Sequence, residues 1–231
     1  MRRLISLITG TWIALAGAAQ ADPSPVVVEL FTSQGCSSCP SADRLLAEMA
    51  GRDDIIPLAL HIDYWDYIGW KDVFARPEFT ARQKGYAKAA QRRSVYTPQM
   101  VINGQHDVVG NRAMDVTDLI RKHAARPSPV TLTIRRDGDT LRVEAVAEAR
   151  IGSADIHVIR YLPLQKVAIK RGENAGKTLT YSHIVSDWTV LGEWNGAGRY
   201  RGAMALKGDE PVVVLVQERR YGPILAAARL R

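Results

Sequence analysis

The sequence predicts an α/β layer domain followed by a small β-sandwich domain. Three observations support this fold class. From residue 26 to about residue 125 β-prone runs alternate with helical ones, and the helical pattern stops after residues 126–129, Arg-Pro-Ser-Pro. The remainder alternates apolar and polar residues between glycine-containing turns. A chain of 231 residues is long enough for two such domains, so we divide it into 22–126 and 127–231.

In the first part, apolar runs at residues 26–31 and 55–62 predict two buried strands. Between them, a helix is expected after Pro40, because apolar residues then recur at helical spacing: Ala42, Leu45, Leu46 and Met49. Residues 76–93 predict a second helix, which forms an inserted segment of about 64–95 together with the aromatic stretch before it. Two short strands at 99–102 and 107–109 and a last helix, capped by Asp115, complete this part.

In the second part, Val130, Leu132 and Ile134 alternate with polar residues, and Asp137-Gly138 predicts a hairpin turn. Alternation resumes from Leu141 to Ala147, and further β-type runs lie at 155–161, 188–194, 203–206 and 211–218. These short strands and their turns are typical of a sandwich.

Composition excludes several classes of protein. With 46% hydrophobic and 24% charged residues, the chain is of the ordinary globular kind, not collagen-like, disordered or coiled-coil. The net charge of +7 is mild and evenly spread, so we expect no nucleic-acid partner. No segment after residue 21 is apolar for long enough to span a bilayer.

Residues 1–21 have the pattern of a signal peptide. Arg2 and Arg3 precede an apolar run from Leu4 to Ala19, and Ala19-Gln20-Ala21 has the small-x-small form of a cleavage site. An uncleaved membrane anchor is the alternative, but the run is shorter than the ~20 residues that a span requires. We therefore expect cleavage after Ala21 and export to the periplasm, an oxidising compartment where thiol pairs rest as disulfides.

Cys36 and Cys39 are the only two cysteines, and their spacing allows a disulfide. Cys36 falls where a strand leads into a helix, so we expect a solvent-exposed sulfur whose thiolate is favoured by the helix N-terminus. Cys39, one turn further on, is expected to be more buried and to act as the resolving thiol. Ser37 and Ser38 between them carry no charge, which predicts no extreme oxidant.

Other interpretations of the pair stay open. A structural disulfide closing only four residues restrains the unfolded chain weakly. Zinc needs four ligands, and the histidines offer no second pair at zinc spacing. Two thiolates, with His61 or His106, also suit Cu(I).

The segment Val27 to Leu46, VVELFTSQGCSSCPSADRLL, with Thr97-Pro98 before a strand, resembles the thioredoxin-like superfamily. Together with the later segments HIDYWDYIGWKD and RGENAGKTLTY, the cysteine segment is similar to an exported bacterial family catalogued as domain of unknown function 1223. The resemblance covers nearly all of the mature chain. It implies a thioredoxin-like domain with a helical insertion, and an activity only by analogy.

Carried over residue by residue, the resemblance makes Cys36 the attacking thiol and Cys39 the resolving one. It makes Pro98 a cis-proline that faces the disulfide, with Thr97 offering its backbone to an extended substrate. Many thioredoxin-like oxidoreductases have a buried acid on the first strand that carries the proton of the resolving thiol, and the resemblance places Glu29 near that position. Glu29 is one position further from the first cysteine than usual, so its side chain facing elsewhere is the alternative.

The aromatic residues Tyr64, Trp65, Tyr67 and Trp70 have two interpretations, a wall that receives a peptide substrate or core packing of the insertion. Of these, Tyr64, Trp65 and Trp70 are the candidates for substrate binding. His61 and Asp63 are either tuning groups for the cysteines or structural residues.

Residues 172–178 imitate a phosphate-binding loop but have three residues between the glycines where four are required. We interpret it as a hairpin or interdomain loop, and it stays open whether Arg171, Glu173 and Asn174 also reach back toward the cysteines.

We therefore expect an exported thiol–disulfide oxidoreductase that acts on protein or peptide thiols, with no cofactor and no metal, and with an unidentified redox partner. The alternative is a non-catalytic thioredoxin-like binding module for Cu(I) or a partner protein. The direction of electron flow and the oligomeric state stay open.

Overall fold

The computed structural model describes residues 24–231, so the expected signal peptide and its cleavage site lie outside the described residues. The elements follow in the order β1 (Val26–Thr32), α1 (Pro40–Glu48), β2 (Ile55–His61), the 3-10 helix η1 (Asp66–Ile68), α2 (Pro77–Ala89), β3 (Gln99–Ile102), β4 (His106–Val109), α3 (Ala113–Ala124), β5 (Thr131–Asp137), β6 (Thr140–Ala147), β7 (Ala154–Ala168), β8 (Thr178–Trp194), β9 (Gly198–Ala205), β10 (Val212–Glu218) and β11 (Ile224–Leu230). None of these helices is both long and apolar enough to cross a membrane.

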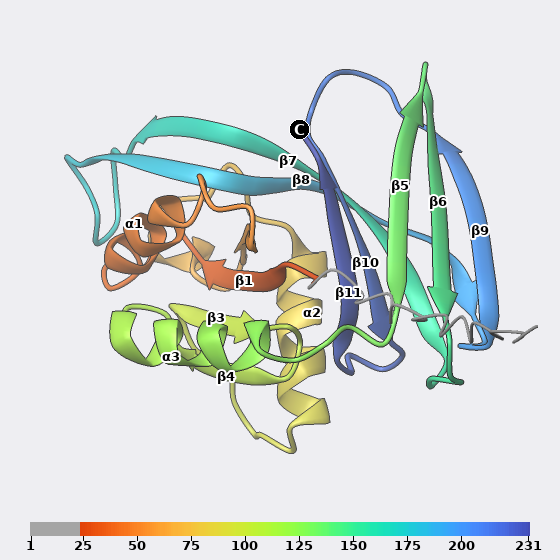
Figure 1. The fold of residues 1–231 in the computed structure, drawn as a ribbon. Helices are drawn as coiled ribbons and strands as arrows, with labels where there is room; N and C mark the ends of the chain where they lie inside the picture. Colours follow the sequence, from red (N-terminus) through yellow and green to blue (C-terminus); the bar gives the residue numbers. More distant parts are fainter. Residues whose placement is uncertain (1–23) are drawn as a thin grey trace, which may run out of the picture.

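One large mixed sheet runs through both parts of the chain. Its strand order is β11-β10-β7-β8-β2-β1-β3-β4, and β1 and β2 are parallel neighbours. The strand β8 joins β2 in parallel through a single residue pair, Ala59 with Ile184. Strands β5, β6 and β9 form a separate three-stranded sheet, and Figure 1 shows it beside β10 and β11 at the end of the molecule far from α1.

The predicted fold class is wrong. The described residues are mostly β, with 44% in strands and 18% in helices, and they do not form a clear α/β thioredoxin domain followed by a β-sandwich. The reason lies in β7 and β8, which are 15 and 17 residues long, whereas the sequence predicted short strands at 155–161 and 188–194. Residues 162–168 of β7 are mostly exposed, and the buried run at 181–185 of β8 includes the polar residues Ser182 and His183, so no clear apolar pattern marked either segment as a strand. The division at residue 126 stays a prediction, although strands from both sides of it share one sheet.

Local elements of the first part lie close to where the pattern predicted them. The helices after Pro40 and after Arg76 and the strands at 26–32, 55–61 and 99–102 are present. In the second part, the hairpin turn at Asp137-Gly138 joins β5 to β6, whereas β11 was not predicted. Residues 169–177 connect β7 to β8, so this segment is the tip of a hairpin.

The period of two along β1 divides its side chains between two cores. Val26, Val28 and Leu30 pack with residues of α1 and α3, whereas Val27 and Phe31 pack with residues of α2. Thr32 therefore faces α1, and Glu29 faces α2. A third core lies between the three-stranded sheet and the outer strands of the large sheet.

Candidate functional site

Cys36 and Cys39 form a disulfide in the loop that joins β1 to α1, with their Cα atoms 5.4 Å apart. Cys39 is the N-cap of α1, and Pro40 occupies the first helical position, where a missing backbone N–H is tolerated. The carbonyl oxygen of Cys39 accepts hydrogen bonds from the backbone N–H groups of Ala42 and Asp43. The pair therefore lies at the N-terminal end of a helix, with Cys39 and not Cys36 at the cap.

The expectation of an exposed Cys36 is wrong. Cys36 is 1% exposed and Cys39 is fully buried, whereas Ser37 and Ser38 between them are exposed. One reason is the segment that contains η1, because Gly35 packs against the side chains of Trp65 and Ile68. The other reason is the hairpin tip between β7 and β8, because it contacts the same loop.

Thr97 contacts the disulfide directly. Its hydroxyl donates a hydrogen bond to Cys36 Sγ at 3.4 Å and accepts one from Trp65 Nε1 at 2.8 Å. The Thr97–Pro98 peptide bond is cis, as the sequence predicted, and Pro98 is buried. Trp65, Thr97 and Cys36 therefore form one chain of polar contacts at the edge of the disulfide.

The aromatic residues are divided between two environments. The ring of Trp65 stacks on Tyr67, which is 81% exposed, at a centroid distance of 6.4 Å. Trp70 Nε1 donates a hydrogen bond to Gln34 Oε1 in the cysteine loop. Tyr64 donates to Gln83 Oε1 on α2, packs against the core, and has its hydroxyl near that of Thr97. Trp65, Tyr67 and Trp70 therefore border the cysteine loop.

The tip of the β7–β8 hairpin holds the other side of that loop. Asn174, which is fully buried, donates from Nδ2 to the carbonyl oxygens of Gln34 and Cys36 at 3.0 and 2.9 Å. Glu173 Oε2 accepts a hydrogen bond from the backbone N–H of Ser37 at 3.2 Å. Both interpretations of this loop are confirmed, since it is the tip of a hairpin and its residues Glu173 and Asn174 reach back to the cysteine loop.

Glu29 lies on the opposite face of the sheet from α1. Its carboxylate accepts two hydrogen bonds from Arg82, at 2.6 and 3.2 Å, and a third from the hydroxyl of Tyr86 at 2.5 Å. This ion pair is buried, and the Arg82 guanidinium also lies 4.0 Å from the ring of Trp188. The structure therefore does not bring Glu29 together with the cysteines.

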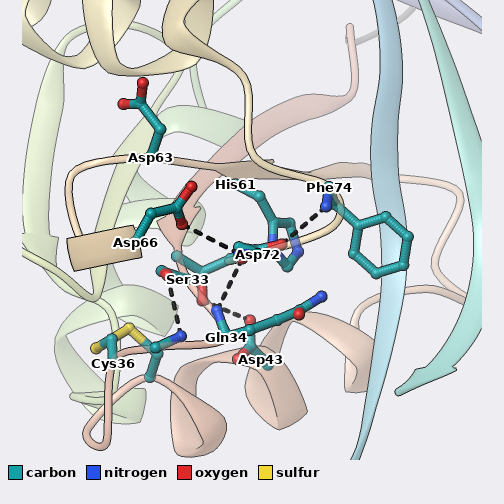
Figure 2. Close-up of polar contacts among 12 residues, drawn as sticks. Ser33, Gln34, Cys36, Asp43, His61, Asp63, Asp66, Asp72 and Phe74 are labelled. Carbon is teal, nitrogen blue, oxygen red and sulfur yellow. Dashed lines mark hydrogen bonds and ion pairs between the residues drawn. A yellow bond between two sulfur atoms is a disulfide. The ribbon is translucent and has the colours of Figure 1, made fainter. Parts of the chain in front are cut away.

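A buried polar cluster lies beside the cysteine loop instead, as Figure 2 shows. Asp72 Oδ2 accepts hydrogen bonds from His61 Nδ1 at 2.7 Å and from the backbone N–H of Gln34 at 2.8 Å. Its Oδ1 accepts a third from the N–H of Phe74, also at 2.8 Å. Asp72 therefore orients His61 and fixes the start of the cysteine loop.

Asp43 belongs to the same cluster. It extends from α1, and its Oδ1 accepts a hydrogen bond from the hydroxyl of Thr32 at 2.9 Å. Burial raises the pKa of Asp43 to about 7, against the opposing effects of His61 and of the Thr32 hydrogen bond. Sequence reasoning missed Asp43 and Asp72. The available signal for Asp43 was its position four residues after Cys39, which places both on one helix face.

The other candidate groups are engaged elsewhere. Asp63 Oδ1 accepts a hydrogen bond from the hydroxyl of Thr80 on α2. His106 Nδ1 lies 2.9 Å from Nε2 of His123, away from the cysteines. In the part of the chain that the structure describes, no three His, Cys, Asp or Glu side chains gather in a way that could hold a metal ion.

This fold and site define a class of protein with a closed Cys-x-x-Cys disulfide at a helix N-terminus, held between an aromatic segment and a hairpin from a distant part of the chain. The family model described as "Protein of unknown function (DUF1223)" matches residues 27–217, so the chain belongs to that family.

Two solved structures are similar to this chain. Protein AGR_C_4864 from Agrobacterium tumefaciens has 33% sequence identity and a TM-score of 0.76, with 89% of this chain and 93% of that chain covered. HBP35 of Porphyromonas gingivalis shares the fold, with a TM-score of 0.60 and 15% identity over 90% of this chain and 75% of that chain. No curated protein matches the sequence.

Proposed function

We propose that this protein is a thiol–disulfide oxidoreductase that acts on protein or peptide thiols through Cys36 and Cys39. The observation that carries the proposal is the disulfide itself, which joins the only two cysteines and lies against Thr97 at the N-terminus of α1. Membership of DUF1223 is compatible with this redox role.

Cys36 is the sulfur that we propose is attacked by the substrate. Its contacts with the hydroxyls of Thr97 and Ser38, both at 3.4 Å, supply polar groups that stabilise a thiolate after the disulfide opens. Cys39 then serves as the resolving thiol, because the hydroxyls that stabilise a thiolate contact Cys36. Since Cys36 is also buried in the closed form, attack requires that Trp65 or the hairpin tip moves aside.

The substrate is proposed to be an extended polypeptide. Trp65 and Trp70 border the cysteine loop together with the exposed ring of Tyr67, and aromatic residues of this kind commonly anchor a partner chain. Thr97, next to the cis Pro98, is proposed to offer its backbone to such a chain.

The test is reduction of insulin by dithiothreitol, followed as turbidity. Wild-type protein should accelerate it, and Cys36→Ser should abolish the acceleration. Cys39→Ala should accumulate a mixed disulfide with its substrate, whereas the matched variant Cys36→Ala should not. Equal rates for wild type and Cys36→Ser would defeat the proposal.

Export to the periplasm is part of the same proposal, because a resting disulfide requires an oxidising compartment. The apolar run and the Ala-x-Ala site support it. Recovery of the protein in an osmotic-shock fraction with Asp22 as its first residue tests it.

The 1% exposure of Cys36 favours a second candidate, a non-catalytic binding module. In that case the closed disulfide holds the loop, and the surface around Tyr67 contacts a partner protein. Absence of insulin turnover by a correctly folded, oxidised wild-type protein would favour this function. Stoichiometric binding of Cu(I) by the reduced protein in excess thiol would favour the copper-binding form.

A further inference from the structure

The outer face of the three-stranded sheet carries a cluster of arginines. Alternate residues of a strand lie on one face, and the inner face of this sheet packs into the core that it shares with the large sheet. The exposed positions of the outer face include Arg135 on β5, Arg142 on β6, and Arg199 and Arg201 on β9. Figure 1 shows this sheet at the end of the molecule far from α1, so the cluster is separate from the disulfide.

A hollow of about 610 Å³ lies on this face, across all three strands. Arg135, Arg142 and Arg201 line it, together with the short side chains of Thr133 and Ala203. Ala203 is directly opposite Arg142 in register, so a methyl group stands where a longer side chain would fill the space. The volume is typical of small-molecule sites, which measure roughly 300–1,000 Å³.

Two of the arginines face each other directly, because Arg135 on β5 is in register with Arg142 on β6. Side chains opposite each other in an antiparallel pair have Cβ atoms about 4.5–5.5 Å apart, and like charges there are destabilising. The Nε of Arg142 donates a hydrogen bond to Asp137 at 3.2 Å, whereas Arg135 has no ion pair within residues 24–231. A bound anion would relieve the repulsion between the two guanidinium groups.

Glu144 holds the third guanidinium group of the hollow. Its carboxylate accepts a hydrogen bond from Nε of Arg201 at 2.8 Å and lies 3.4 Å from the guanidinium of Arg199. The hydrogen bond from Arg201 lowers the pKa of Glu144, which is therefore ionised at neutral pH. Three guanidinium groups and one carboxylate line the hollow, so they leave two positive charges there.

We propose that this hollow binds a phosphate group through Arg135, Arg142 and Arg201. Its two positive charges match a phosphate dianion, and the planar guanidinium group binds phosphate oxygens in pairs. Guanidinium groups that face each other across two strands can contact different oxygens of one phosphate. The phosphate belongs either to a soluble compound or to a lipid headgroup. This site does not depend on the proposed redox function.

The extent of the charge separates this site from a nucleic-acid surface. Arg199 and Asp137, at the margin of the hollow, carry opposite charges and cancel. Proteins that bind nucleic acids rely on many phosphate contacts at once, which an isolated pair of positive charges does not provide. The ligand is therefore a single phosphate group and not a chain of them.

The first test is a titration of inorganic phosphate into the oxidised wild-type protein at neutral pH, with sodium chloride keeping the ionic strength constant. The backbone amide NMR signals of residues 133–144 should shift and saturate, and the melting temperature should rise with phosphate. Absence of saturable shifts would overturn the proposal. A larger response to succinate, a dianion with two carboxylates, would overturn the choice of phosphate.

The variants separate a site from general charge. Arg135→Ala and Arg142→Ala should each bind phosphate more weakly by on the order of 10-fold, because one charge-assisted contact is lost. Arg135→Lys keeps the charge without the planar group and should fall between wild type and Arg135→Ala. Arg121→Ala removes an exposed arginine on α3 and should keep the wild-type affinity. An equal loss in Arg121→Ala would overturn the proposal.

Folding does not limit this test, because the side chain of Arg135 is exposed. Without phosphate, Arg135→Ala should melt at no lower temperature than wild type, since it removes a repulsive pair. A lower melting temperature would count against the site, because Arg135 would then serve the fold. The titration involves no reaction at the cysteines, so its result is independent of insulin turnover.

The source of the phosphate is tested with vesicles that contain phosphatidylcholine and phosphatidic acid, whose headgroup ends in a phosphate. Sedimentation of the wild type with these vesicles, lost in Arg135→Ala, assigns the site to a lipid headgroup. Wild type that binds inorganic phosphate but stays in the supernatant assigns it to a soluble compound. Sedimentation that Arg135→Ala leaves unchanged, without any response to inorganic phosphate, overturns the proposal.

Discussion

The side-chain amide of Asn174 donates a hydrogen bond to the carbonyl oxygen of Cys36 at 2.9 Å, although the two residues are 138 positions apart in the sequence. The same amide reaches the carbonyl oxygen of Gln34. A residue at the tip of a hairpin therefore determines the backbone conformation of the cysteine loop.

Replacing Asn174 by alanine leaves two carbonyl oxygens of the cysteine loop without their donor. We expect the free energy of unfolding of the oxidised protein to fall by about 1–3 kcal/mol, the usual penalty for unpaired buried polar groups. The disulfide should also be reduced faster by dithiothreitol, because the hairpin tip no longer holds the loop. Urea denaturation and thiol quantification measure the two effects. Asn111→Ala, at an exposed turn, should change neither.

Replacing Glu173 by glutamine should make reduced Cys36 more reactive. The carboxylate of Glu173 accepts a hydrogen bond from the N–H of Ser37 and places a negative charge at the cysteine loop, and this charge disfavours a thiolate; the amide oxygen of glutamine accepts the same hydrogen bond without the charge. The glutamine variant should therefore react faster with iodoacetamide at mildly acidic pH. A lower rate than wild type would contradict this assignment.

The stability of the protein should depend on pH through Asp43. Its pKa is raised from 3.8 to about 7 in the folded protein, so between these values the folded chain keeps a proton that the unfolded chain has lost. The stability that this proton provides is complete below about pH 4 and is lost as the pH rises through 7. The upper limit is on the order of 4 kcal/mol.

The measurement is urea denaturation of oxidised wild type and Asp43→Asn at several pH values. Asparagine keeps an oxygen that accepts the hydrogen bond of Thr32, but it does not titrate. Relative to wild type, the variant should gain stability as the pH rises from 4 to 8. A constant difference across this range would show that Asp43 is ionised throughout.

Glu29→Gln should weaken the fold without changing the chemistry of the disulfide. It removes one partner of a buried ion pair with Arg82, which typically reduces stability by about 3–5 kcal/mol. Because Glu29 faces α2, the pH profile of disulfide reduction should match wild type under conditions where the variant is folded. A profile that differs from wild type would contradict the separation of Glu29 from the disulfide.

Local pattern predicted the elements around the disulfide because they depend on nearby residues. The apolar run before Cys36, the proline at the start of α1 and the helical spacing of Ala42 and Leu46 are all short-range signals. The sequence did not predict the shared sheet, because the pairing of Ala59 with Ile184 depends on contacts between distant segments. The burial of Cys36 depends on Trp65 and on the hairpin tip, which lie far from it in the sequence.

Asp43 and Asp72 illustrate the same limit for polar residues. An aspartate on a helix or in a loop is ordinarily exposed, and nothing in its neighbouring residues indicates burial. Their environment is created where β1, β2, α1 and β8 meet, which the period of any one element does not reveal.

The shared sheet also limits how the protein can be shortened or recombined. A fragment ending at residue 126 would lack Glu173, Asn174 and Tyr181, and it would leave the edge of β2 that β8 covers open to aggregation. Chimeras that exchange the portion after residue 126 would likewise bring a foreign hairpin to the cysteines. Minimal versions of this protein must therefore retain β7 and β8 in full.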